Sequence, residues 1–305
     1  MSTPMSPRNR GGFTLLELMI ALTIGLVVLA SAMAVTAGTW RSVRGVTIRD
    51  GVTRNSRYIG VTLQRDVQET GVDLSSAPNF GSLVTFGDTI AILRVPYAPT
   101  AAPQYALSTA NFANGVCGVA CLDIQTGGVA PQLAVGDIAR VQISNTRRLI
   151  YVTAVAVAAG GAYRINFVNA PRLLHNAGGI QGVAIAAAGT FVQRLGVVVY
   201  YRNGTQLMRA TRLSAAFVPQ GEVIATGIQT WNARLVFTDN NLVAQADSGS
   251  DGSTLNDYDD IAALRVQATI QGDRTDPRVN GGLPVTKQMQ WWFAPRNLIY
   301  ERNKA

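Results

Sequence analysis

The stretch Gly12-Phe13-Thr14-Leu15-Leu16-Glu17 decides how this chain is organised, because largely apolar sequence follows it without a further charge as far as Thr39. An apolar run of about 20 residues is long enough to cross a bilayer as a helix. Glu17 is the one charge in this run, and a carboxylate at membrane depth costs roughly 2.5–3.5 kcal/mol. The sequence therefore predicts a membrane helix whose single acid has a partner or a function.

Basic residues before this run, Arg8 and Arg10, would also fit an ordinary secretory signal. The apolar core of such a signal is about 7–15 residues long and ends at a small-residue cleavage site. Here the run is longer, contains Glu17 and continues past its small residues Ala30-Ser31-Ala32. An ordinary signal or a plain membrane anchor is the alternative interpretation.

The order of a basic leader, Gly12, Phe13, a threonine, two leucines and Glu17 resembles the class III signal of type IV prepilins and of type II secretion pseudopilins. The resemblance implies that a membrane aspartyl peptidase, the prepilin peptidase, cuts between Gly12 and Phe13 and methylates the new amino terminus. The cation nearest to Glu17 would then be an α-amino group, that of Phe13 or of an adjacent subunit, which gives Glu17 a role in assembly. The K-type tip pseudopilin typically lacks this glutamate, so Glu17 suggests a subunit just below the tip or within the fibre.

Charge alone does not settle the membrane orientation, because the run is also followed by basic residues, Arg41, Arg44 and Arg49. The resemblance implies a single-pass inner-membrane protein with its head in the periplasm, and later a place in the pilus fibre at the cell surface. The predicted organisation is a leader peptide over residues 1–12, a transmembrane or filament-core helix over 13–39, the amphipathic half of the same helix over 40–70, and a periplasmic β-rich head over 71–305.

The helical pattern continues without proline from Phe13 to about Thr70 and becomes amphipathic from Trp40. Apolar residues at intervals of seven, four and four form one stripe, and the charged residues are expected mostly off it. The stripe consists of Val52, Ile59, Leu63 and Val67; the charged set is Arg54, Arg57, Arg65 and Asp66.

Beyond Gly71 the sequence changes to short β-branched runs between turn residues. Strands are predicted over 89–95, 138–144, 149–157, 163–168, 191–202, 206–211, 222–228, 234–238, 261–270 and 285–293. Asn203-Gly204 between two apolar runs predicts a hairpin. The expected fold is α+β and type IV pilin-like, with a long N-terminal helix packed on an antiparallel β-sheet head.

Three further stretches resemble PilW-type minor pilins: Leu63–Val67 with Gly71, Val198–Arg202 with Gln206–Arg209, and Trp292–Leu298. J-type pseudopilins of type II secretion share the N-terminus and are the second resemblance. The PilW resemblance implies a minor pilin of the initiation or tip complex, whose partners are other minor and major pilins and the inner-membrane assembly platform. Such a pilus could serve twitching motility, cell adhesion or DNA uptake.

Signatures of catalysis are scarce in this sequence. It has one histidine, His175, no Gly-x-Ser-x-Gly motif and no lysine after a glycine. A histidine-based triad, a nucleophile elbow and a Walker A loop are therefore not expected. We expect a protein that is not an enzyme and has no catalytic residues and no cofactor.

Cys117 and Cys121 are separated by three residues. A zinc site would need two more ligands, which one histidine cannot supply well, and a redox pair usually has two intervening residues. We expect a disulfide between the two cysteines that closes a small loop in a periplasmic head.

The charge distribution raises two binding hypotheses. Six of the 18 acids lie between Asp239 and Asp260, and Asp239, Asp247 and Asp251 form a weak calcium candidate; a solvated acidic loop without metal is the favoured interpretation. The net charge of +8 would permit binding to DNA or an acidic surface, but scattered surface arginine explains it more simply.

Overall fold

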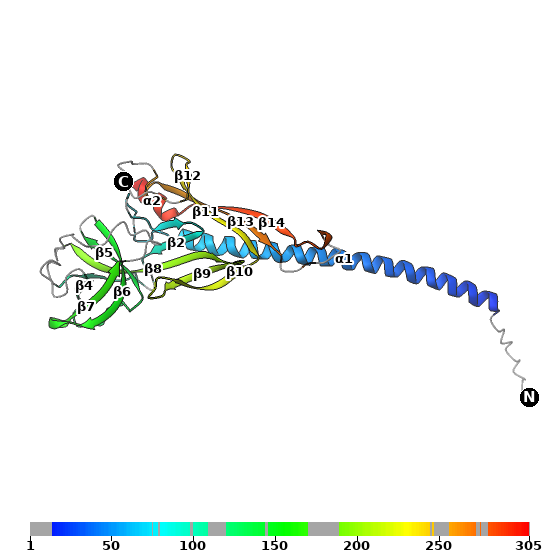
Figure 1. The fold of residues 1–305 in the computed structure, drawn as a ribbon, viewed down its shortest axis with the longest axis horizontal. Coiled ribbons are helices and arrows are strands. Elements are labelled where there is room, and N and C mark those ends of the chain that lie inside the picture. The colour runs from blue at the N-terminus through cyan, green and yellow to red at the C-terminus, as the bar shows by residue number, and fades with distance from the viewer. Residues whose placement is uncertain are drawn as a thin grey trace, which may run out of the picture.

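One long helix, α1 (Leu15–Gln68), organises the molecule. In the computed structural model its N-terminal half projects away from the rest of the chain, and its C-terminal half enters a β-rich head (Figure 1). Within the part of the chain described, α1 is the one helix long and apolar enough to cross a membrane. The structure describes residues 14–74, 76–78, 80–97, 100–108, 120–143, 146–169, 189–244, 246, 256–272, 275 and 280–304.

The head is built from two antiparallel sheets. The larger, ten-stranded sheet has the order β1-β2-β8-β5-β6-β7-β4, with β9 paired to β8, β10 to β9 and β3 to β8, and the smaller has the order β12-β11-β13-β14. Their strands are β1 (Leu83–Phe86), β2 (Thr89–Arg94), β3 (Gln104–Ala106), β4 (Cys121–Gln125), β5 (Ile138–Ile143), β6 (Thr146–Val157), β7 (Ala162–Asn169), β8 (Thr190–Asn203), β9 (Gln206–Leu213), β10 (Pro219–Thr226), β11 (Ile228–Phe237), β12 (Leu242–Val243), β13 (Ile261–Gln271) and β14 (Thr286–Phe293). A short helix, α2 (Arg296–Lys304), follows the last strand.

Strand β8 joins two lobes of the larger sheet. Its first half pairs with β3 and β5, and its second half pairs with β2 and β9. Each lobe has its own apolar core: the main core surrounds the end of α1, and a second core, which includes Ile124, Val141 and Ile165, fills the lobe of β4 to β7. Figure 1 shows this second lobe at the end of the molecule farthest from the N-terminus.

The C-terminal half of α1 lies between the two sheets. Asn55 donates a hydrogen bond to the carbonyl oxygen of Thr226 at the end of β10, 3.4 Å away. Near it, the indole of Trp291 on β14 covers Gly60 so closely that a Cβ there would lie 2.8 Å from the indole nitrogen. Glycine at this position therefore allows the smaller sheet to approach the helix.

The predicted α+β architecture is confirmed, and so is the apolar stripe of α1. Val52 is 2% exposed, and the other three stripe residues are completely buried. A strand is present at each of the ten predicted places, with ends shifted by up to three residues, except that β11 begins six residues before the predicted start at 234. The predicted hairpin joins β8 to β9, with Gly204 and Thr205 as its loop residues. Strands β1, β3, β4 and β12 and helix α2 were not predicted.

One expectation about the helix is wrong. Asp66 does not lie among the solvated charges, because its side chain is 1% exposed. The seven-residue interval that relates Val52 to Ile59 also relates Ile59 to Asp66, so the carboxylate is on the buried face.

Candidate functional site

The N-terminal end of α1 carries the residues of the predicted processing and assembly site. Gly12 and Phe13 lie outside the described residues, and the described chain begins at Thr14. Thr14 is the N-cap of α1: its hydroxyl accepts a hydrogen bond from the backbone N–H of Glu17 at 3.3 Å. The Glu17 carboxylate in turn accepts hydrogen bonds from the backbone N–H of Thr14 at 3.1 Å and from its hydroxyl at 3.0 Å.

This reciprocal arrangement is a capping box, and it gives Glu17 a partner within its own chain. It satisfies N–H groups that the start of a helix otherwise leaves free. Sequence reasoning sought the partner of Glu17 only among α-amino groups. The sequence pattern that indicates this capping box is a threonine three residues before a glutamate at the start of an apolar run.

The apolar half of α1 also satisfies its own polar side chains. The hydroxyls of Thr23, Ser31, Thr36 and Thr39 each donate to a backbone carbonyl three or four residues earlier, at 2.8–3.0 Å. In a bilayer every polar group needs such an internal partner. The segment can therefore remain in lipid, or among other apolar helices, without a stranded donor.

Residues 7–33 match the family model of the prokaryotic N-terminal methylation motif. The motif is of the prepilin type and supports a place in the type IV pilin and pseudopilin family. Together with the apolar helix, it indicates a membrane-anchored protein. No curated protein matches the chain.

A second polar site lies at the other end of α1, where Asp66 meets the β8–β9 hairpin. Its carboxylate accepts hydrogen bonds from the hydroxyl of Tyr200 at 2.5 Å and from Nε and Nη2 of Arg209 at 2.7 and 3.1 Å. Tyr200 is completely buried, and the Arg209 side chain is 14% exposed. Burial, followed by the hydrogen bond to Asp66, raises the pKa of Tyr200.

Helix α2 completes this end of α1. The side-chain amide of Asn297 donates to the carbonyl oxygens of Gln68 and Thr70, at 2.9 and 3.2 Å. The Gln68 carbonyl is one of those that a helix leaves unpaired at its C-terminal end, and Thr70 follows the C-cap residue Glu69. We call Asp66, Tyr200, Arg209 and Asn297 the α1 junction; its residues come from the three stretches on which the expectation of a PilW-type pilin is based.

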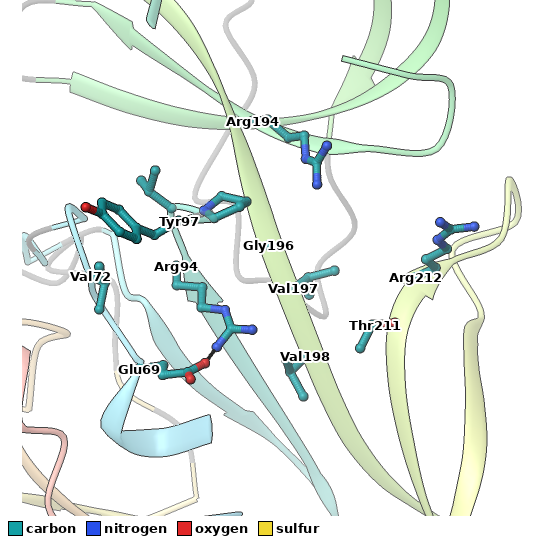
Figure 2. A pocket seen from close by; sticks show the side chains of 12 residues that line it. Glu69, Val72, Arg94, Tyr97, Arg194, Gly196, Val197, Val198, Thr211 and Arg212 are labelled. Carbon is teal, nitrogen blue, oxygen red and sulfur yellow. Dashed lines mark ion pairs between the residues drawn. The ribbon is translucent and has the colours of Figure 1, made fainter. Parts of the chain in front are cut away.

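A cavity of about 670 Å³ lies beside the α1 junction, between the end of the helix and the strands β2, β8 and β9. Figure 2 shows Arg94 directed at Glu69, with which it forms an ion pair, while Arg194 and Arg212 lie farther along the cavity. Burial lowers the pKa of Arg94, and the charge of Asp66 opposes that shift. This ion pair connects Glu69, the C-cap residue of α1, to Arg94 at the end of β2.

The structure describes one of the two cysteines of the predicted disulfide. Cys121 is the first residue of β4, is 4% exposed and is not a free cysteine. Cys117 lies outside the described residues, so the pairing of the two cysteines stays a prediction.

Of the three predicted calcium candidates, Asp239 lies within the described residues. Asp239 lies in the turn after β11, where its carboxylate accepts hydrogen bonds from the backbone and side-chain amides of Asn241 at 2.9 and 2.5 Å. Asp247, Asp251 and also His175 lie outside the described residues. Within the parts of the chain described, no three acidic, histidine or cysteine side chains form a group that could hold a metal ion.

Proposed function

We propose that this chain is a PilW-like minor pilin that takes part in type IV pilus assembly, in the complex that starts or tops the fibre. The methylation motif followed by α1 supports this, because one half of the helix is free for a bundle and the other is fixed in a subunit-specific head. Cleavage between Gly12 and Phe13 would release the leader, and the head would face the periplasm. The contribution is packing, without catalysis or cofactor.

Contacts of the free helix with other pilins would carry the assembly. In the bundle, the Glu17 carboxylate would exchange its bonds to Thr14 for the amine of an adjacent subunit. That exchange is favourable because an ion pair of full charges in apolar surroundings is stronger than hydrogen bonds to neutral donors.

The test is co-purification of tagged full-length chain from membranes, with the parent compared with Glu17→Ala. We expect normal cleavage and membrane insertion but reduced recovery of partner pilins. Thr23→Val, which removes a hydroxyl already bonded to its own helix, is the control. Undiminished recovery with Glu17→Ala would contradict the proposed assembly role.

A minor pseudopilin of type II secretion shares the same motif and is the alternative. The same experiment separates the two, because the partners recovered would be components of a secretion system instead of pilins.

A further inference from the structure

The outer face of the smaller sheet carries an ordered array of polar side chains. Its helix-facing side is apolar and contacts α1, and the side chains of the opposite side are half-buried on β11 and β13 and exposed on β14. The register of the three longer strands aligns three rows, each with one residue from β11, β13 and β14. The rows are Arg234–Arg265–Trp292, Asn232–Gln267–Gln290 and Thr230–Thr269–Gln288.

Two arginines stand directly opposite each other on this face. Arg234 and Arg265 are register partners on adjacent strands, and like charges in that position destabilise a sheet. Neither guanidinium has a carboxylate partner among the described residues, and none of the nine positions of the array is acidic. The pair therefore repels itself in the free protein, and an anion placed between the two groups would relieve that repulsion.

The hydrogen-bonding capacity of both guanidinium groups is largely unused. Arg234 donates from Nε to the side-chain oxygen of Asn232 at 3.2 Å, and Arg265 reaches that of Gln267 at 3.5 Å. Nε of Arg265 is buried and has no hydrogen-bond partner. Since a guanidinium has five N–H donors, the terminal nitrogens of both groups still have donors for a ligand that accepts two bonds at once, such as a carboxylate.

An exposed aromatic ring ends the same row. Arg265 lies over the ring of Trp292, with its guanidinium carbon 5.7 Å from the ring centroid. Trp292 is nevertheless 55% exposed. An indole offers apolar area on which the C–H face of a sugar ring can pack. The neighbouring amides of Gln267 and Gln290 each provide donors and acceptors of the kind that hydroxyl groups require.

We propose that this face binds an acidic oligosaccharide. The arginine pair and the amide row line a hollow of about 640 Å³ and would take the carboxylate and the hydroxyls. Trp292, the register partner of Arg265 beside that hollow, would take the sugar ring. Single-stranded nucleic acid would use similar groups, but it requires cations along several phosphates and repeated aromatic platforms. The array offers two cations and one ring, which fits one charged sugar residue better. The site is independent of the proposed assembly role.

The experiment measures binding of short oligogalacturonate chains to the full chain in detergent micelles, by calorimetry at one fixed salt concentration. The fully methyl-esterified form of the same sugar is the uncharged comparison, and oligothymidylate is the nucleic-acid comparison. We expect the acid to bind at least about tenfold more tightly than the ester, because a bond between charged groups is about twice as strong as a neutral one.

Variants then assign the binding to the array. Arg234→Gln and Arg265→Gln should each weaken binding of the acid about tenfold, and Trp292→Leu should weaken the acid and the ester alike. Arg57→Gln is the matched control, since it removes an equal charge from an exposed position on α1. If a glutamine variant fails to fold, Arg234→Lys decides the matter, because it keeps the charge and loses the planar fork.

Three results would overturn the proposal. The first is equal affinity for the acid and the ester in the parent protein. The second is a loss of binding no larger in the array variants than in Arg57→Gln. The third is binding confined to oligothymidylate, which would make the face a nucleic-acid surface.

Discussion

Removal of the positive charge at the α1 junction should destabilise the head strongly. In Arg209→Met the Asp66 carboxylate would keep the Tyr200 hydroxyl and the exposed Arg65 guanidinium 3.6 Å away, but it would lose both Arg209 bonds while it remains 1% exposed. A buried ion pair that loses one partner costs about 3–5 kcal/mol of folding free energy. With a urea m value of about 2 kcal/mol per M, the unfolding midpoint should fall by about 1.5–2.5 M.

The assay is urea unfolding of the detergent-solubilised full chain, followed by near-ultraviolet circular dichroism. The matched control is Asp50→Asn, which breaks an exposed ion pair with Arg54, where the two side chains are 61% and 81% exposed. Such a pair contributes at most about 1 kcal/mol, so this midpoint should hardly move. A shift in Arg209→Met no larger than that of the control would refute the reasoning.

A third variant separates charge burial from packing. Asp66→Leu, Tyr200→Phe and Arg209→Met together replace the polar cluster with apolar groups. Because they leave no charge stranded, the triple variant should be more stable than Arg209→Met alone. A loss in the triple variant equal to the sum of the three single losses would show that the groups act independently.

Four other outcomes follow from the two ends of α1 and from the loop before β4. Gly12→Leu should block processing, and a mutant that still runs at the processed mass would contradict the leader assignment. Cys117 and Cys121 should be oxidised to each other in protein from the periplasm, so two free thiols in non-reducing mass spectrometry would reject the disulfide. Thr14→Val removes the cap and should lower helix stability by about 1 kcal/mol, measured as a loss of amide protection at the start of α1. The raised pKa of Tyr200 keeps it neutral when tyrosines of the unfolded chain ionise near pH 10. Stability should therefore fall as pH rises above about 10, and comparison with Tyr200→Phe should isolate this loss in the difference between their unfolding free energies.

Local patterns predicted most of the fold. The stripe from Val52 to Val67 and the long strands repeat their apolar residues often enough to identify an element and its buried face. Strands β3 and β12 have three and two residues, too few for a period to emerge. Nor does any local pattern indicate that β8 would be shared between two lobes, because that depends on pairing partners distant in the sequence.

The two sites also differ in how far they could be predicted from local sequence. The N-terminal motif is contiguous, so Gly12, Phe13 and Glu17 could be singled out from sequence, whereas the capping role of Thr14 was missed. The α1 junction joins Asp66 to partners 134 and 143 residues away, and a lone acid on a helix is ordinarily solvated. Only the interval of seven from Ile59 marked its position as buried.

A buried charge at the end of α1 specifies the register of the helix against the sheets in a way that the apolar stripe cannot. Ile59, Leu63 and Val67 follow one another at intervals of four, so a slip of about 5.4 Å, one helical turn, would place one apolar side chain near the site of another. Asp66 has one set of partners on β8 and β9, and a slip of one turn would strand its carboxylate in the core at a cost of about 3–5 kcal/mol. The carboxylate therefore selects one axial position of the head on the helix, and the apolar triple variant should lose this selection even where it retains stability.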